Sequence, residues 1–457
     1  MLRKEMRAMK SIFTKRHTWK PAKIIVSFYL IAAIVAICLL SLPIALKPGV
    51  HWSFVDIVFT AVSALSVTGL SVVSTADTFS TTGVFLLLFI LQFGGIGIMT
   101  LGTFIWLVLG KKIGMKERQL IMTDQNQSYL SGLVKLMKQI LLIIVLIEIV
   151  GTLVLGTYFL NYFPTWQEAY FQGLFAAVSA TTNAGFDITG NSLIPFAHDY
   201  FVQFINVILL TLGAIGFPVL IELKDFMMKK KNNFNHFSLY TKLTTLTFFS
   251  LMIFGTIIIL LFEFNHFFAD KSWHESFFYA FFQSSTTRNG GLATMDMAHF
   301  SEPTLLFLCF LMFIGASPSS VGGGIRTTTF AVIVLLLISF AKGQKSVKVF
   351  RREIDEDDIR KSVVVSFLAF LICFIAIIIL LITEHFSLIQ IVFEVSSAFG
   401  TTGLSLGITP ELTEIGKVVI IALMFIGRIG ILSFIFLFHR GDDQANYHYP
   451  TEKIIVG

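Results

Sequence analysis

The chain has 457 residues, of which 55% are hydrophobic and only 14% are charged, with 49 phenylalanines and a formal net charge of +6. The mean hydropathy is +0.80. This composition excludes an ordinary soluble domain, in which charged residues make up about a quarter. We attribute the positive charge to the loops of a membrane protein and not to nucleic-acid binding.

Several apolar runs are long enough to cross a bilayer, whose hydrocarbon core needs about 20 residues of helix. They include residues 24–46, 84–109, 139–160, 246–264 and 363–383. The first run is longer than the apolar part of a signal peptide, so we expect it to remain as a span. The three cysteines lie in apolar runs without ligand-like spacing, which predicts neither a disulfide nor a metal site. The sequence therefore predicts an all-α integral membrane protein.

The basic residues indicate how the chain is oriented. Twenty-eight of the 34 lysines and arginines lie in five segments: the N-terminal arm up to residue 23, residues 111–138, 224–242 and 342–361, and the C-terminal tail. Because basic loops stay on the cytoplasmic side of a membrane, we expect both termini and the three basic loops in the cytoplasm. Between consecutive cytoplasmic segments the chain must leave and return, four times in all.

One short pattern occurs in each of the four excursions: FTAVSALSVTGL (59–70), FAAVSATTNAGF (175–186), FFQSSTTRNGGL (281–292) and FEVSSAFGTTGL (393–404). All four copies begin with phenylalanine and have serine at the fifth position and glycine at the eleventh. Identities in register at a near-constant period indicate a fourfold duplication. The predicted domains are a basic arm (1–23), four repeats (24–110, 133–228, 239–341 and 361–438) and a cytoplasmic tail (439–457).

Each repeat is predicted to consist of a span, a pore loop and a second span. The short helix before each glycine has about a dozen residues, or about 18 Å, which is half of a membrane. Non-helical backbone at that depth is tolerated only where protein covers it or water fills the space beside it. Four pore loops around a pseudo-fourfold axis meet this condition, because their glycine-containing strands then face a central pore.

A pore of this kind suits a cation. Backbone carbonyls replace the water shell of a cation without net charge, and turning successive carbonyls inward favours backbone angles that glycine adopts at low cost. The simpler alternative is that the glycines are close-packing points between helices. The predicted selectivity filter consists of Val67, Thr68, Gly69, Asn183, Ala184, Gly185, Asn289, Gly290, Gly291, Thr401, Thr402 and Gly403.

The four loops, which end in VTGL, NAGF, NGGL and TTGL, resemble those of the Trk/Ktr/HKT superfamily of potassium transporters. The resemblance covers nearly the whole chain and is greatest to the bacterial KtrB-type membrane subunit, because no extra pair of spans precedes the first repeat. It implies a potassium uptake system of the bacterial plasma membrane, with K+ bound by the filter carbonyls. The alternative is a symporter coupled to sodium, or a Na+-selective member of the superfamily; Na+ as a co-ion or activator is left open.

The stretch SPSSVGGGIRT (317–327) interrupts the apolar run 304–340. One helix of that length would be far longer than a bilayer requires, and the proline and three glycines predict a break at membrane depth. The resemblance implies that this break is an intramembrane gate below the filter, whereas the simpler alternative is a kink between packed helices. The gate residues are Ser317, Pro318, Ser319, Ser320, Val321, Gly322, Gly323 and Gly324, together with Arg428.

Arg428 lies in the apolar stretch FIGRIGIL. A buried arginine in a span usually faces a cavity or a partner, and the resemblance implies an arginine close to the gate. A positive charge about 7 Å from the ion path would cost a passing cation about 2 kcal/mol at an effective dielectric constant near 20. The structural alternative is an ion pair with a carboxylate such as Glu394.

The resemblance also implies partners: a homodimer among membrane lipids and a separate cytosolic ring of nucleotide-binding RCK-type subunits. The basic loops and RREIDEDDIRK (351–361) are candidate docking surfaces. GGGIR lacks the lysine of a phosphate-binding loop, so no cofactor is expected in this chain.

An intramembrane serine hydrolase would use Ser317, Ser319 or Ser320, but no histidine lies within a span. A coupled secondary transporter would usually show inverted repeats, whereas these four repeats run in the same direction.

Overall fold

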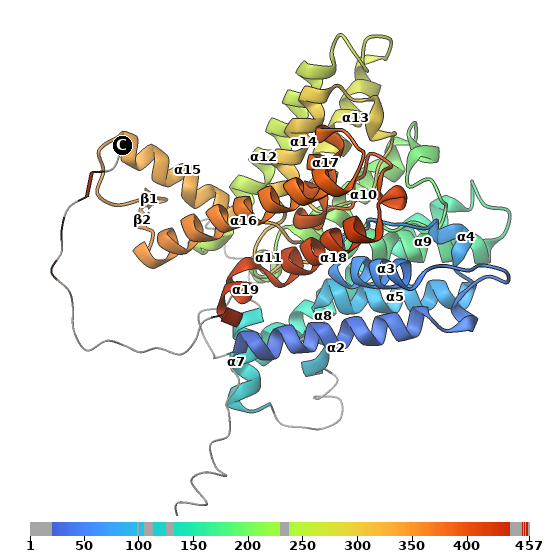
Figure 1. Cartoon of the computed structure of the whole chain (residues 1–457), viewed down its shortest axis with the longest axis horizontal. Helices are drawn as coiled ribbons and strands as arrows, with labels where there is room; N and C mark the ends of the chain where they lie inside the picture. The colour runs from blue at the N-terminus through green and yellow to red at the C-terminus, as the bar shows by residue number, and fades with distance from the viewer. Residues whose placement is uncertain are drawn as a thin grey trace, which may run out of the picture.

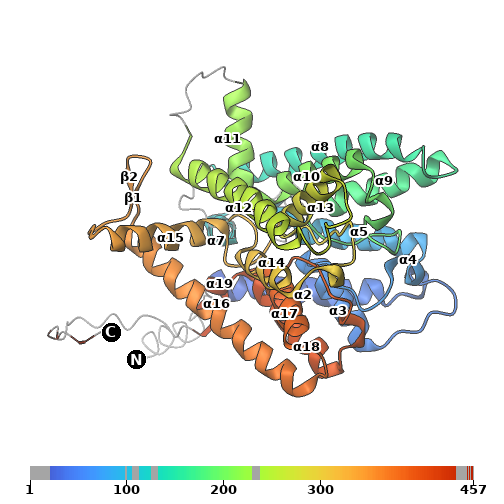
Figure 2. The same ribbon diagram turned by 90° about the horizontal axis from the view of Figure 1, so that it is seen from above.

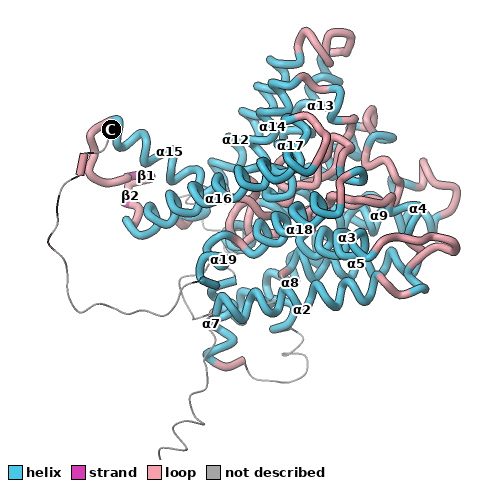
Figure 3. Tube along the Cα trace, viewed as in Figure 1, coloured by secondary structure: helices cyan, strands magenta, loops and turns pink. Residues whose placement is uncertain are grey.

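The computed structural model describes residues 21–97, 100–104, 113–124, 132–228 and 237–438, together with residues 450, 452, 454 and 455. Most of the predicted basic arm and cytoplasmic tail therefore lies outside the described residues. The described part is mainly helical, as predicted; in Figure 3 its only strands are those of one small hairpin. We refer to the four predicted repeats as units one to four.

Each unit begins with a long helix. Among the described residues, these helices are long and apolar enough to cross a membrane. They are α2 (Pro21–Leu40), α8 (Leu133–Phe159), α12 (Leu239–Glu263) and α16 (Glu356–Thr383). Apolar side chains on their outer faces, such as Ile34, Leu153 and Phe367, are exposed in the isolated chain, as expected for surfaces that face lipid.

Each long helix is followed by a short one, and the short helix begins at a serine or threonine. The short helices are α3 (Phe54–Ser66), α9 (Trp166–Thr181), α13 (Trp273–Thr286) and α17 (Leu388–Gly400). Ser272 and Ser387 form capping boxes with Glu275 and Gln390. Such caps satisfy the first N–H groups of a helix and fix where each short helix begins.

The last apolar helix of every unit is interrupted. These helices are α5 (Thr81–Ile96), α10 (Tyr200–Ala214), α14 (Glu302–Ile314) and α18 (Glu414–Ile429). The chain breaks at Gly97, Gly216, Gly315 and Gly430, with φ angles of 92°, 103°, 68° and 87°. These angles lie in the left-handed region that glycine adopts without a steric penalty.

The sequence predicted the break only in unit three. α5 ends at Ile96, inside the apolar run 84–109, so this run is not one continuous helix. After the breaks the chain continues as α11 (Phe217–Met228), α15 (Thr327–Ala341) and α19 (Ile431–Phe438). The axes of α10 and α11 differ by 104°.

The units pack in a closed order (Figures 1 and 2). The last apolar helix of each unit contacts the short helix of the next: α5 packs on α9, α10 on α13, α14 on α17, and α18 returns to α3 of unit one. The largest hydrophobic cluster joins units one and four, with Phe59, Leu87, Phe399 and Met424 among its buried members. Units at opposite ends of the chain therefore share one core.

Two parts lie outside this helical body. α7 (Met115–Asp124) follows unit one and packs against α2 and α8. The hairpin β1 (Lys348–Val349) and β2 (Arg352–Glu353) projects with α15 and the start of α16 from one side of the molecule (Figures 1 and 2). Its two-residue turn, Phe350–Arg351, has positive φ at both residues, as a tight hairpin requires. The hairpin and the start of α16 carry the candidate docking segment 351–361.

Candidate functional site

The four predicted filter segments have the same backbone conformation. The φ angle is positive at Val67, Asn183, Asn289 and Thr401 (52°, 54°, 71° and 52°) and again at Gly69, Gly185, Gly291 and Gly403 (94°, 68°, 68° and 93°). A positive φ is uncommon at a residue other than glycine. The four non-glycine residues nevertheless occupy the same position of the pattern found in the sequence. The repeat in the sequence is therefore also a repeat in the backbone.

The four glycines meet at one place. A Cβ atom on Gly69 would lie 2.6 Å from the carbonyl oxygen of Ala184, and one on Gly185 would lie 2.9 Å from the Cα of Gly291. A Cβ on Gly291 would lie 2.5 Å from the carbonyl oxygen of Thr402, and one on Gly403 would meet the carbonyl oxygen of Thr68. The contacts run from each unit to the next and return to unit one. We call this arrangement the glycine ring.

The residue before each glycine supplies a carbonyl to this ring. Ala184, Thr402 and Thr68 present theirs to the glycine of the neighbouring unit, and the carbonyl oxygen of Gly290 lies 3.4 Å from the Cβ position of Gly185. All four of these residues are buried. The ring thus brings together four uncharged carbonyl oxygens from four separate parts of the chain.

A hydroxyl at or beside the serine of the repeated pattern holds the segment that contains the glycine. Ser63 Oγ donates to the carbonyl of Leu70, and Ser179 Oγ donates to that of Phe186, each over 2.6 Å. In unit three, Thr286 Oγ1 makes the equivalent bond to Leu292, at 2.7 Å. In unit four, Ser397 Oγ instead accepts from Gly403 N–H, at 3.0 Å. A hydroxyl on the short helix therefore fixes the returning strand in every unit.

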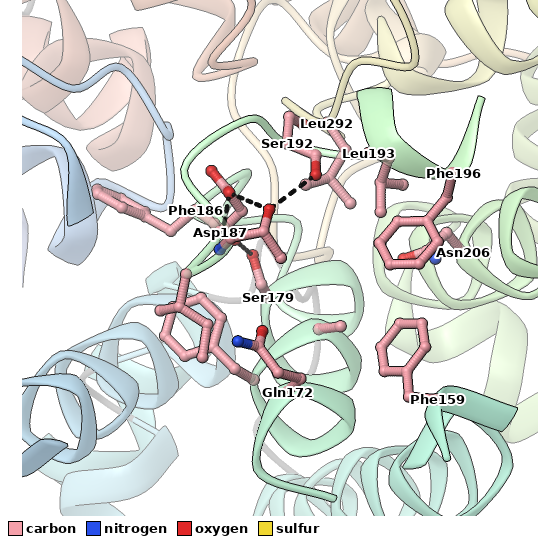
Figure 4. A pocket seen from close by; sticks show the side chains of 14 residues that line it. Phe159, Gln172, Ser179, Phe186, Asp187, Ser192, Leu193, Phe196, Asn206 and Leu292 are labelled. Carbon is pink, nitrogen blue, oxygen red and sulfur yellow. Dashed lines mark hydrogen bonds between the residues drawn. The ribbon is translucent and has the colours of Figure 1, made fainter. Parts of the chain in front are cut away.

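A small cavity lies behind the segment of unit two (Figure 4). Its lining includes Ser179, Phe186, Asp187 and Asn206, and its volume of about 30 Å³ has room for about one or two water molecules. Asp187 follows the filter segment and accepts hydrogen bonds from Thr189 Oγ1 and Gly190 N–H, both at 2.7 Å. The carboxylate of Asp187 therefore stabilises the turn that leaves the segment.

Glycines in three of the last apolar helices allow close contact with the short helices. A Cβ on Gly94, Gly213 or Gly427 would collide with a main-chain carbonyl oxygen of the short helix of its own unit. These oxygens belong to Leu65, Thr181 and Phe399, which occupy the same position of the repeated pattern. Gly315 aligns with these glycines in the sequence, but it lies against Gly323 instead. Unit three thus departs from the other units at this point.

The predicted gate residues form a non-helical loop, residues 315–326, between α14 and α15. The loop pairs with the break of unit two. Ser317 N–H donates to Ala214 O at 3.1 Å, and Phe217 N–H donates to Ser319 O at 2.8 Å. Tyr240 OH donates to the carbonyl of Pro318 at 2.5 Å. These bonds satisfy backbone groups that would be costly to leave unpaired inside a membrane.

The 315–326 loop also contacts two of the four filter segments. Gly323 N–H donates to Thr401 Oγ1 at 2.8 Å. Asn289 Nδ2 donates to the carbonyl of Thr401 at 2.9 Å, and a Cβ on Gly322 would lie 2.7 Å from the same Nδ2 atom. The predicted gate residues and part of the predicted filter therefore form one hydrogen-bonded assembly.

Arg428 is buried, with 8% of its surface exposed. Its guanidinium donates to the carbonyls of Val321 in the loop and Gly94 in α5, and to Gly95 O at 3.4 Å. The ion pair with Glu394 is wrong: the carboxylate of Glu394 accepts from Ser405 and, at 3.1 Å, from Thr409 Oγ1. Arg428 binds backbone oxygens because glycine-rich breaks leave carbonyls without helical partners.

Two further arginines, to which the sequence assigns no role, also bind backbone carbonyls. Arg288 is only 2% exposed and donates to the carbonyls of Leu311 and Gly315 at the end of α14. Arg326 donates to the carbonyls of Gly322 and Ser317 within the loop. Their position in or near apolar chain was the available signal, since arginine there requires a partner.

The serines that a hydrolase would use are bonded within the loop. Ser317 Oγ accepts from Thr327 Oγ1 at 3.0 Å, and Ser320 Oγ donates to Ser317 O at 2.6 Å. These bonds stabilise the loop.

Comparisons with known proteins agree with this geometry. The TrkH family model, described as a cation transport protein, matches residues 10–448. The chain is 62% identical to Ktr system potassium uptake protein D of Bacillus subtilis, over 96% of this chain and 97% of that protein. It is 37% identical to Ktr system potassium uptake protein B of the same organism, again over 96% and 97%. It is 33% identical to the potassium/sodium uptake protein NtpJ of Enterococcus hirae, over 99% of this chain and 100% of that protein.

Among solved structures, the potassium transporter TrkH from Vibrio parahaemolyticus has the same fold. Its TM-score is 0.73 over 93% of this chain and 86% of that one, at 20% sequence identity. The family resemblance predicted from the four loops is confirmed: the chain is a multi-pass membrane protein that belongs to the TrkH family of cation transport proteins.

Proposed function

We propose that this protein is the membrane subunit of a potassium uptake system and that K+ passes through the glycine ring. The observation that carries the proposal is the set of four carbonyls, from Thr68, Ala184, Gly290 and Thr402, beside four glycines of matching φ. A bare cation in an apolar medium is penalised by tens of kcal/mol, and inward carbonyls offset this penalty. Four units in closed order around a pseudo-fourfold axis supply one such carbonyl each.

The proposal that the transported ion is K+ rests on the names of similar proteins. Two of them are named as potassium uptake proteins, which favours K+ as the transported ion. The relative from Enterococcus hirae is named as a potassium/sodium uptake protein. A role for Na+ as a co-ion or activator is therefore the second candidate, and a dependence of potassium flux on external sodium in liposomes would identify it.

In this proposal the 315–326 loop is the gate. It lies at the break of unit three, and Arg428 joins it to α5 of unit one. For the gate to open, the hydrogen bonds of Arg428 and the bond from Gly323 N–H to Thr401 Oγ1 must break, and other partners must replace them. The buried guanidinium also raises the energy of a cation that passes close to it.

The proposed assembly is a homodimer in the bacterial plasma membrane, with both termini in the cytoplasm. A cytosolic ring of nucleotide-binding RCK-type subunits would bind the cytoplasmic face. The projecting hairpin and the first two turns of α16 supply exposed groups of both signs for such docking, among them Glu356, Arg360 and Lys361.

The test replaces Gly69 or Gly185 with serine. A side chain at either position would collide with the neighbouring filter segment, so we expect weaker discrimination of K+ from Na+ in cells that lack potassium uptake. Gly407→Ser is the matched control. Gly407 follows the filter of unit four and also has a positive φ, 87°, but no atom lies within 4 Å of its Cβ position. Unchanged selectivity in both ring variants would contradict the proposal.

A further inference from the structure

A second polar site lies away from the glycine ring, between units one and two. α5 and α8 form the walls of a cavity of about 270 Å³, and Leu174 and Val178 of the short helix α9 also line it. Ile149 and Leu153 of α8 line the same cavity and are exposed at the outer surface of the chain. The cavity therefore opens toward the membrane side of the molecule and not toward the glycine ring.

Three polar side chains line this otherwise apolar cavity: Gln92, Glu148 and Thr152. Gln92 Nε2 donates to Glu148 Oε2 at 2.7 Å. Three oxygens are buried and have no hydrogen-bond partner within the described residues: Gln92 Oε1, Glu148 Oε1 and Thr152 Oγ1. Three residues that line one cavity thus carry a carboxylate, an amide and a hydroxyl oxygen that are buried without a partner within the described residues.

Charge makes this arrangement costly without a ligand. Glu148 is only 7% exposed, and it lies in the middle of α8, a helix of membrane-spanning length. A carboxylate at that depth is normally paired, yet the residues that line the cavity include no lysine, arginine or histidine. A positive ligand would neutralise Glu148.

We propose that this cavity binds a small monovalent metal cation of the sodium class. All three unpaired atoms can act as ligands to a hard cation, which prefers oxygen. One positive charge balances Glu148, whereas a divalent ion would leave a net charge in the membrane. Protonation of Glu148 is the alternative to a metal ion. A proton on Glu148 Oε1 could be donated to only one of the other two oxygens, so the third would still lack a partner. The bound ion would lie against α9, and the chain continues from the C-terminal end of α9 into Asn183, Ala184 and Gly185. A cation bound in this cavity would therefore stabilise the position of the filter segment of unit two.

The experiment measures sodium binding to the purified full-length protein in lipid nanodiscs without potassium. Thermal midpoints are recorded as sodium chloride replaces choline chloride, and retained radioactive sodium is counted in parallel. We expect sodium to raise the midpoint of the wild-type protein. Glu148→Gln should abolish this rise and lose one bound sodium per chain, and Thr152→Val should weaken binding about tenfold, as expected for about 1.4 kcal/mol.

Two further variants keep the test independent of transport. Glu411→Gln, an exposed carboxylate outside the cavity, should respond to sodium like the wild type. Gly69→Ser, altered in the glycine ring, should also keep the response that depends on Glu148, even if it loses potassium selectivity. Thr152→Val provides the answer if Glu148→Gln fails to fold.

Two results would overturn the proposal. The first is a sodium response that survives in both Glu148→Gln and Thr152→Val. The second is a wild-type midpoint that ignores sodium but changes with pH in a manner that Glu148→Gln removes. In that case the carboxyl group carries a proton and the cavity holds no metal ion.

Discussion

Arg428 fixes the position of the 315–326 loop through hydrogen bonds to backbone oxygens. Its guanidinium connects Val321 of the 315–326 loop to Gly94 of α5, so one side chain both places a positive charge and holds the loop to unit one. Replacement by glutamine removes the charge and retains some hydrogen-bonding capacity. We expect Arg428→Gln to raise potassium flux by up to about thirtyfold, since a barrier of about 2 kcal/mol would disappear. Flux in liposomes and protein yield are measured together.

The yield separates the two roles of Arg428. A purely structural arginine would leave buried carbonyls unpaired when it is replaced, and the protein would fold poorly. A well-folded Arg428→Gln protein with unchanged flux would therefore remove the electrostatic role. Arg360→Gln, which changes an exposed arginine of α16, controls for the loss of a positive charge elsewhere in the chain.

Thr401 connects the predicted gate residues to the predicted filter residues. Its Oγ1 accepts from Gly323 N–H and from Asn289 Nδ2, both at 2.8 Å, and valine has nearly the same shape but no acceptor. An unpaired buried N–H costs about 1–3 kcal/mol, so Thr401→Val should destabilise the observed loop position and raise flux about tenfold. In Thr402→Val the lost hydroxyl has no partner within the described residues, so a clearly smaller effect is expected. Equal effects would show that the bond to Gly323 is unimportant.

At the scale of elements, the 315–326 loop holds three units together. Its residues from Val321 to Gly324 bind Gly213 of unit two and Thr401 and Arg428 of unit four. Deletion of Val321 to Gly324 removes all of these contacts and shortens the proposed gate. We expect faster potassium flux that responds less to the proposed cytosolic subunits, measured in liposomes with and without those subunits. A folded deletion protein with unchanged flux would leave the loop as a kink between helices.

Several elements could be predicted from the sequence because they repeat. The phenylalanine, serine and glycine recur in register, and the serine or a neighbouring hydroxyl makes the corresponding bond in each unit. The breaks at Gly97 and Gly430 were not predicted, because glycine is also common in continuous membrane helices. The break at Gly216 was missed although Pro218 follows it, and a proline shortly after a glycine is a signal for a helix end. The hydrogen bonds of Arg288, Arg326 and Arg428 could not be predicted either. Their acceptors are backbone carbonyls, which every residue has, so residue types do not identify them.

At the scale of the whole molecule, the closed order depends on the junction between units four and one. α18 packs against α3 there, and Lys417 Nζ lies 2.7 Å from Asp56 Oδ1. The two side chains are 13% and 18% exposed. Burial raises the pKa of Asp56, but the bonds from Lys417 and Ser53 outweigh burial and lower this pKa below the ordinary value of 3.8. Ser53 caps α3, so the pair also fixes the start of a short helix.

The lowered pKa of Asp56 determines when this junction weakens. A carboxyl group with a depressed pKa in the folded protein binds more protons when unfolded, so its stabilisation is present above about pH 4 and is lost as the pH falls through the folded pKa. Lys417→Gln should lower stability by about 1 kcal/mol at neutral pH, and its thermal midpoint should converge with that of the wild type in acid. Lys361→Gln, which breaks an exposed pair with Asp358, should have little effect. The thermal midpoints of wild type and Lys417→Gln could instead differ by the same amount in acid as at neutral pH. In that case the packing of α18 on α3, and not the ion pair, would hold units four and one together.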